Sequence, residues 1–207
     1  MEARPSDRGQ AFPVYIVAVA GLLFAALAFF VVGMAGATRS DAQKAADASA
    51  LAAAREARDG VFGDLKLPDL KPADWEKILN GQAFDARDAC AEAERFAEMN
   101  DATANCVASL PKVSVSVTTD GTVGKSVIPG TDAVHGKARA TAVIKPLCSL
   151  ESAPVTAPSP APTDGSVEEP ESISIKCSGE SPFKLDPQNP GQLSKLARRL
   201  FSVRLVT

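Results

Sequence analysis

The sequence predicts an α+β protein in which a single N-terminal transmembrane helix continues into a long alanine-rich helix, followed by a small exported domain with an antiparallel sheet. Three observations lead to this fold class: a charge-free apolar run, an alanine-rich segment after it, and later segments in which valine alternates with polar residues. Helical segments come first and strand-like segments follow, an order typical of α+β domains whose sheet has one face covered by helix.

Composition limits the size and the partners of the folded part. The chain has 207 residues, and its net charge of -3 favours neither nucleic acid nor an anionic membrane surface as a partner. Outside the apolar run and a proline-rich tract, about 130 residues remain for packing, which is enough for one small domain. The sequence therefore predicts four regions in order: a short cytoplasmic N-terminus (1–10), a transmembrane helix (11–37), an alanine-rich juxtamembrane helix (38–60) and an exported α+β domain (61–207).

The apolar run is long enough to cross a bilayer. No charged residue occurs from Ala11 to Ala37, and a helix needs about 20 such residues to span the hydrocarbon core. A cleaved secretory signal is the alternative, because Ala35-Gly36-Ala37 fits the small-residue cleavage pattern. Apolar regions of signal peptides run to only about 7–15 residues, so a permanent anchor is favoured.

Orientation is read from the cysteines. Basic residues lie on both sides of the run, with Arg4 and Arg8 before it and Arg39 and Lys44 after it, so the positive-inside rule is indecisive. The four cysteines form an even set, and disulfides persist outside the cytosol. This indicates a plasma-membrane protein with a cytoplasmic N-terminus and an extracytoplasmic C-terminal domain.

The helix is expected to continue past the bilayer. The segment "SDAQKAADASALAAAREARDG" contains no proline, alanine is the best helix former, and Gly60 is a common type of helix stop. One helix from about Pro13 to Asp59 is therefore predicted. Small residues along it would let a partner helix approach closely, or would pack against the protein's own sheet. The candidates for helix contact are Gly21, Ala25, Ala28, Gly36, Ala46 and Ala53.

The N-terminal residues resemble a known family. A short N-terminus ending in "RGQ", an apolar span and "TRSDAQKAADASALAAAREARD" are similar to the start of TadE/TadG-like proteins of the tight-adherence (Flp) pilus assembly system. The later "ACAEAERFAEMNDATANCVASLPKVSVSV" is similar to a helix–Cys–strand pattern of short actinobacterial, TadG-related members. The resemblance implies a small pilin-like envelope protein associated with pilus assembly or a related secretion system.

Two departures refine the resemblance. Prepilin-type cleavage follows a glycine and requires a glutamate five residues later, but the fifth residue after Gly9 is Val14. This argues against processing and polymerisation as a true pilin. Larger TadG proteins carry a metal site with the pattern D-x-S-x-S, whereas the stretch from Asp47 has Leu51 in place of the second serine and lies in a predicted helix. No metal site is expected there.

The exported domain shows two further helices and several strands. "PADWEKILNG" places Trp75, Ile78 and Leu79 on one helical face, and "DARDACAEAERFAEMN" forms an alanine stripe with Asp85 as a possible N-cap and Asn100 as a possible left-handed terminator. The strand-like segments are "KVSVSVTTDG", "GKARATAVIKP", "SISIKC" and "FSVRLV". A proline-rich stretch at about 152–171 is expected to be a disordered insertion.

Four cysteines allow three pairings. Proximity along the chain favours Cys90 with Cys106 and Cys148 with Cys177, the second bridge enclosing the proline-rich insertion.

Motifs for catalysis are missing from the sequence. His135 is the single histidine, the cysteines show no C-x-x-C spacing, and no phosphate-binding glycine motif occurs. No cofactor, small-molecule substrate or nucleic acid is expected as a ligand. The predicted function is that of a non-catalytic component that contacts the lipid bilayer and other pilus or secretion-system membrane proteins. The alternative is a membrane-tethered module that binds or senses an extracellular ligand.

Overall fold

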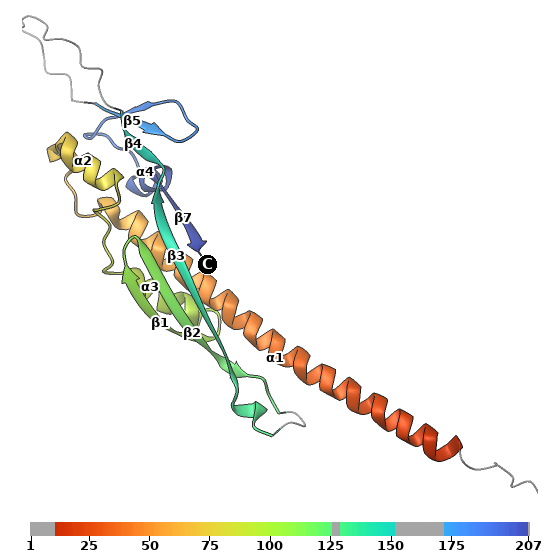
Figure 1. Ribbon diagram of the computed structural model, residues 1–207. Coiled ribbons are helices and arrows are strands. Elements are labelled where there is room, and N and C mark those ends of the chain that lie inside the picture. Colours follow the sequence, from red (N-terminus) through yellow and green to blue (C-terminus); the bar gives the residue numbers. More distant parts are fainter. Residues whose placement is uncertain (1–10, 126–128, 152–171, 207) are drawn as a thin grey trace, which may run out of the picture.

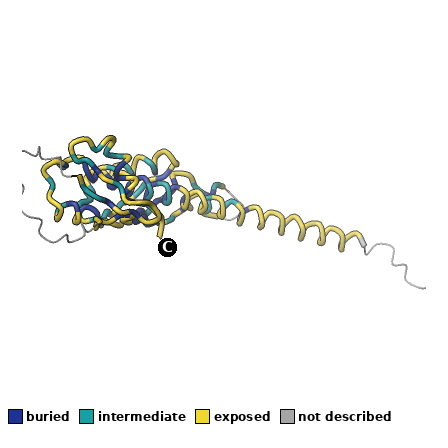
Figure 2. Tube along the Cα trace, turned by 90° about the horizontal axis from the view of Figure 1, so that it is seen from above, coloured by how far each residue is buried: buried dark blue, intermediate teal, exposed yellow. Residues whose placement is uncertain are grey.

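The computed structural model describes residues 11–125, 129–151 and 172–206. Its first element is one unbroken helix, α1 (Ala11–Asp59), half of which extends away from the rest of the molecule (Figures 1 and 2). The predicted α+β fold with a long N-terminal helix is confirmed, and α1 ends where Gly60 indicated. The expected N-terminal tail (1–10) and proline-rich insertion (152–171) lie outside the described residues.

The elements after α1 form one domain beside its C-terminal half (Figure 1). The helical elements are η1 (Gly60–Phe62), η2 (Leu67–Asp69), α2 (Pro72–Leu79), α3 (Ala89–Glu98), η3 (Thr131–Ala133) and α4 (Leu193–Leu200). The strands are β1 (Ala102–Ser109), β2 (Lys112–Thr122), β3 (His135–Pro146), β4 (Cys148–Leu150), β5 (Ile173–Cys177), β6 (Phe183–Leu185) and β7 (Phe201–Val206).

An antiparallel sheet in the order β1-β2-β3-β7 packs along α1. In β2 the valines at 113, 115 and 117 are buried while the intervening serines are only half-buried, as expected for a sheet with one covered face. Their partners in β3 are the alanines at 142, 140 and 138. The inner face is therefore built from valine and alanine, and α1 and α3 form the layer that covers it.

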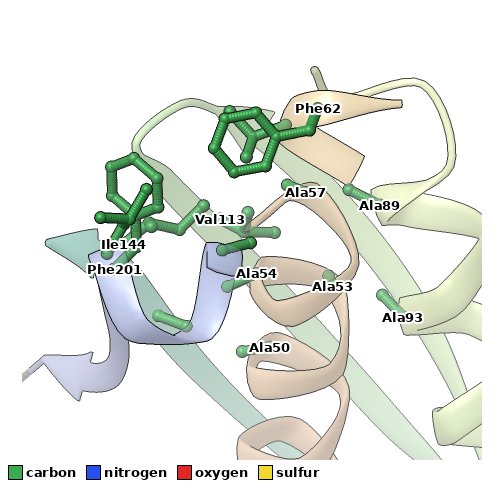
Figure 3. Close-up of a cluster of buried hydrophobic side chains, with 14 of the residues drawn as sticks. Ala50, Ala53, Ala54, Ala57, Phe62, Ala89, Ala93, Val113, Ile144 and Phe201 are labelled. Atoms are coloured by element: carbon green, nitrogen blue, oxygen red, sulfur yellow. The ribbon is translucent and has the colours of Figure 1, made fainter. Parts of the chain in front are cut away.

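Alanine sets the close spacing within the helix layer. Seven alanines of α1 between Ala42 and Ala57 are at most 3 % exposed: Ala42, Ala45, Ala46, Ala50, Ala53, Ala54 and Ala57. In Figure 3, Ala53 points toward Ala93 of α3, whereas Ala50 and Ala54 lie on the opposite side of the helix, toward Ile144 and Phe201. Because alanine side chains end at Cβ, one helix can touch both a neighbouring helix and the sheet.

Larger side chains fill the end of the domain farthest from the free end of α1. Phe62 and Trp75 pack with ring centroids 6.1 Å apart, and Phe84 meets Phe201 edge-on at 4.9 Å. A second antiparallel sheet, β4-β5-β6, lies at this end together with α2 (Figure 1). Trp75 is fully buried, which agrees with its expected place in the core.

The ends of α3 differ from the sequence-based prediction. The helix begins at Ala89, so Asp85 is not its N-cap. The Asp85 carboxylate instead accepts a hydrogen bond from the backbone N–H of Arg87 (2.9 Å), which forms a turn ahead of the helix. The left-handed residue after the helix is Asp101 (φ 51°) and not Asn100. Asp and Asn both tolerate this conformation, so sequence alone does not separate them.

Candidate membrane-contact site

The most distinctive surface of the molecule is the N-terminal part of α1, residues 12–30, here called the free half. Every residue in this stretch is exposed, and its large apolar side chains include Phe12, Leu22, Phe24 and Phe29, each more than 70 % exposed. Residues 12–30 extend for about 28 Å at 1.5 Å per residue, close to the hydrocarbon thickness of a bilayer. Among the described residues, one helix is long and apolar enough to cross a membrane. The mean hydropathy of its most apolar 18 residues is 2.7.

The free half is not a core helix of the domain. Only 6 % of its most apolar window is buried, and Figure 2 shows exposed residues along its length up to the domain. The first buried side chain is Val31. The sequence placed the span at 11–37; within its last part Val31 is buried and Met34 is half-buried, whereas residues 32, 33 and 35–37 stay exposed.

The contact at this boundary comes from the end of the β2–β3 hairpin, which runs along α1 toward the free half (Figure 1). A Cβ atom added at Gly136 of β3 would overlap the carbonyl oxygen of Thr38, so only glycine allows the strand this close to the helix. Nearby, Gly124 (φ +89°) lies against the side chain of Met34. The hairpin end is therefore in direct contact with α1 where the helix leaves the domain.

Hydrogen bonds hold the hairpin end in shape. The buried hydroxyl of Thr119 donates to the Gly121 carbonyl (2.7 Å) and accepts from the Gly136 N–H (2.9 Å). The ring Nδ1 of His135 lies 2.7 Å from the Thr119 carbonyl oxygen. His135 thus begins β3 and helps to hold the hairpin end in shape. The sequence did not predict this contact; a glycine at the start of an alternating segment, Gly136, was the only sign of it in the sequence.

Small residues on the free half and just beyond it remain available for contact. Gly21, Ala25, Ala28 and Gly36 are exposed and share one face of the helix, and nothing of the chain lies within 4 Å of a Cβ added at either glycine. The hairpin contacts at Met34 and Thr38 lie on a different side, more than a third of a turn away by helical geometry. A partner could therefore reach this small-residue face.

Two of the predicted contact residues are placed differently. Ala46 and Ala53 are fully buried within the chain's own domain and have no free side for a partner. The physical reason is that small side chains permit close packing against the chain's own elements as well as against a partner. Here they let α1 approach α3 and the sheet. The alanine-rich segment after the span is thus the centre of the domain core.

The four cysteines form two disulfides, Cys90–Cys106 and Cys148–Cys177. The first joins α3 to β1, and its Cα atoms are 5.5 Å apart. The second joins β4 to β5, where the two cysteines are direct partners in the antiparallel register. The first bridge fixes the helix layer to an edge strand, and the second lies at the distal sheet.

Ionisable groups are not gathered into a reactive site in the part of the chain that the structure describes. No group of three or more His, Cys, Asp or Glu residues is arranged to hold a metal ion there. Asp47, the residue considered above for a metal site, accepts a hydrogen bond from the Gln43 amide (2.8 Å) on the surface of α1.

The shifted pKa values have structural causes. The pKa of Asp85 is lowered, first by the hydrogen bond from the Arg87 backbone and then by the Arg87 side chain. Arg87 donates to both Asp64 and Asp85, which raises the pKa of its guanidinium. On α3, the hydrogen bond from Arg95 (2.9 Å) lowers the pKa of Glu92, and Glu92 raises that of Arg95. These are exposed ion pairs that join neighbouring turns and loops.

Comparison with known proteins gives one family. Residues 9–56 match the family described as Flp pilus-assembly TadE/G-like. Neither the curated proteins nor the solved structures contain a match to the chain. The matched residues comprise the free half of α1, the contact with the hairpin end and most of the alanine core. The predicted resemblance is thereby confirmed over these residues, which make up less than a quarter of the chain.

Proposed function

We propose that the chain is a membrane-anchored, non-catalytic component of Flp-type pilus assembly or of a related secretion system. The observation that carries this proposal is the continuity of α1: its free half has the length and polarity of a membrane span, and its other half is the core of the domain. The family match over residues 9–56 supports the pilus-assembly context.

The proposed orientation has the N-terminus in the cytoplasm and the domain outside. Two disulfides support it, because such bonds persist outside the cytosol. The absence of a glutamate at Val14 supports a protein that keeps its apolar segment instead of being processed as a pilin. Intact-mass measurement of the chain extracted from membranes tests this. A mature N-terminus at Gln10 would indicate processing as a pilin, and one at Thr38 would indicate a secreted protein without the anchor.

Contacts within the membrane are proposed to come from the face that carries Gly21, Ala25, Ala28 and Gly36. Lipid provides no hydrophobic drive for helix association, so close backbone approach at small residues is the main source of affinity. Replacing Ala25 and Ala28 together by leucine should abolish recovery of other pilus-assembly membrane proteins with the chain. Ala26→Leu is the matched control, because Ala26 is equally exposed but lies about 100° around the helix from Ala25.

The test of the function itself is made in the cell that produces the protein. The tagged chain is purified from membranes in mild detergent, and the co-purified proteins are identified by mass spectrometry. Recovery of Flp-type assembly or secretion components, together with loss of assembly when the gene is deleted, is the expected result. Unchanged assembly after deletion, with no such component recovered, would refute the proposal.

A ligand-binding module is the second candidate. It is favoured by a shallow hollow of about 570 Å³ on the face of the main sheet that points away from the helices, lined by Thr103, Asn105, Ser116, Thr118 and Lys137, among others. The hollow is open to solvent, whereas small-molecule sites are usually enclosed. This surface is better suited to a protein partner than to a small ligand.

A further inference from the structure

The outer side of the main sheet is an uncovered basic surface. We call it the open face; it consists of the residues of β1, β2, β3 and β7 that the strand register places on this side, which are exposed or half-buried except for Val143, buried opposite Lys112 and Arg204. Its charged members are Lys112, Lys137, Arg139, Lys145, Arg204 and the single acid Asp120, all exposed.

The cations of the open face form no ion pair with an acidic side chain of the described residues. Arg139 donates to the Ser116 hydroxyl (2.9 Å), and the carboxylate of Asp120 accepts from Thr103 at the end of the sheet (3.2 Å). No ion pair forms among the described residues of this face. The alternating serines and threonines between the cations include a hydrogen-bonded pair, Ser114 and Thr141 (2.9 Å). The face therefore has unpaired positive charge, exposed hydroxyl groups and the shallow hollow.

The opposite layer carries the complementary charge. Residues 88–101, here called the acidic segment, contain α3 and hold five carboxylates, at Asp88, Glu92, Glu94, Glu98 and Asp101, but a single cation, Arg95. Arg95 pairs with Glu92, which leaves the exposed carboxylates of Glu94 and Glu98 on the outer side of the helix. The opposite side of α3 faces the core and carries the buried alanines at 89, 93 and 97.

The two charged surfaces lie at the same level along α1 and on opposite layers. The Cys90–Cys106 disulfide holds α3 beside β1, and α3 packs against both β1 and α1. A neighbouring copy with the same orientation in a membrane can therefore bring its acidic segment onto the open face by a sideways shift. Two open faces brought together would instead oppose like charges.

We propose that the open face of one copy binds the acidic segment of the next, so that copies associate head-to-tail in a row. Such an interface is heterologous: the two contacting surfaces differ, and each joined pair leaves one open face and one acidic segment free to extend the row. This inference rests on the proposed function for the shared orientation of the copies. It adds that the chain recognises itself through its domain, separately from any contact of the free half.

The test uses the full tagged chain in membranes of an expression host that has no Flp-type system. A photo-crosslinking benzoylphenylalanine replaces Asn105, which is exposed on β1 within the hollow. Illumination should give crosslinked dimers and longer ladders, and mass spectrometry should place the crosslink in residues 88–101 of the second copy. If no such crosslink formed, self-association would be refuted. The proposed function would not be affected, because no other pilus component is present in this host.

Charge reversal tests the complementarity. Lys137→Glu with Arg139→Glu, or Glu94→Lys with Glu98→Lys, should each lower the dimer yield about tenfold, since exposed charge pairs contribute modestly and several are reversed together. Co-expression of the two double variants should restore the ladder, because each then offers the face that the other lacks. The control matched to the Lys137 and Arg139 variant, Lys176→Glu with Lys184→Glu on the distal sheet, makes the same change in net charge and should leave the yield unchanged.

Circular dichroism tests whether each variant folds. We expect that all of them do, because the four replaced side chains are exposed. Dimer yields that do not respond to reversal, or a mixture that fails to restore them, would overturn the proposal. A crosslink that maps to the open face of the second copy would overturn it as well.

Discussion

Replacing Ala53 by leucine tests whether the alanines of α1 belong to the domain core or serve a partner helix. Ala53 is fully buried, and it points toward Ala93 of α3 (Figure 3). Leucine adds three carbon atoms at a place where two helices meet through alanine. If these alanines instead served a partner helix, the same change would leave folding of the isolated chain intact and disturb only assembly.

The expected cost follows from the fixed position of α3. Extra methylene groups in a packed core cost about 1–3 kcal/mol. The Cys90–Cys106 disulfide ties α3 to the edge strand, so the helix cannot readily move away to make room. We therefore expect a loss near the upper end, about 3 kcal/mol. With a slope of about 1.5 kcal/mol per molar urea, the unfolding midpoint should fall by about 2 M.

Trp75 provides the measurement. It is the single tryptophan of the chain and is fully buried beside Phe62, so its emission reports unfolding of the domain. Urea titration of the full chain in mild detergent compares wild type, Ala53→Leu and the control Ala91→Leu, which makes the same change at an exposed position of α3. A midpoint for Ala53→Leu within about 0.3 M of the control would refute the core assignment.

Three further predictions use related measurements. Replacing Cys148 and Cys177 by serine should cost about 3.5 kcal/mol, because the bridge closes a loop with a sequence separation of 29; peptide mapping without reduction that found Cys90 joined to either of them would contradict the pairing. Gly136→Ala should destabilise the domain by about 1–3 kcal/mol through overlap with Thr38, whereas Gly121→Ala, where an added Cβ meets nothing within 4 Å, should change the urea midpoint little. Arg95→Ala should raise the pKa of Glu92 toward its ordinary value of 4.5, as measured by carbon NMR titration. Since the folded pKa is the lowered one, the ion pair stabilises α3 above about pH 4.5 and loses this effect as the pH falls through the folded pKa; an unchanged Glu92 pKa would rule the pair out.

The parts of the fold that the sequence predicted are those with a strong periodic pattern. The apolar and alanine-rich segments predicted α1. The alternation of valine with serine or threonine in residues 113–118 predicted β2 and its buried face. Strand β1 was missed because its residues, "ATANCVAS", alternate only weakly between apolar and polar types. Helix α4 was missed for a different reason: eight residues after a stretch rich in turn-forming residues gave too short a pattern to assign.

The candidate site was harder to predict because small residues do not identify their partner. Gly21 and Ala53 both permit close approach, yet the first is exposed and the second is enclosed by α3 and the sheet. The sequence did not predict the open face either. Lys112, Arg139 and Arg204 are far apart in the sequence, and only strand pairing places their side chains on one side of the sheet. A net charge of -3 for the whole chain conceals two surfaces of opposite sign.

The continuity of α1 links the two proposed contacts. The helix has no proline after Pro13 and no break before Asp59, and the hairpin end contacts it at Met34 and Thr38, just beyond the free half. Rotation of the span about its axis must therefore rotate the domain by the same amount. Contact through the face of Gly21 within the bilayer would then set the direction in which the open face points, so that one membrane contact determines which neighbour the domain can reach. A flexible break inserted near Ser40 should uncouple the two in the producing cell, where partners of the free half are present: crosslinking through Asn105 would persist, while any effect of the leucine variants at Ala25 and Ala28 on it would disappear. If the leucine variants at those positions still altered the Asn105 crosslink in the interrupted helix, α1 would not be the element that couples the contacts.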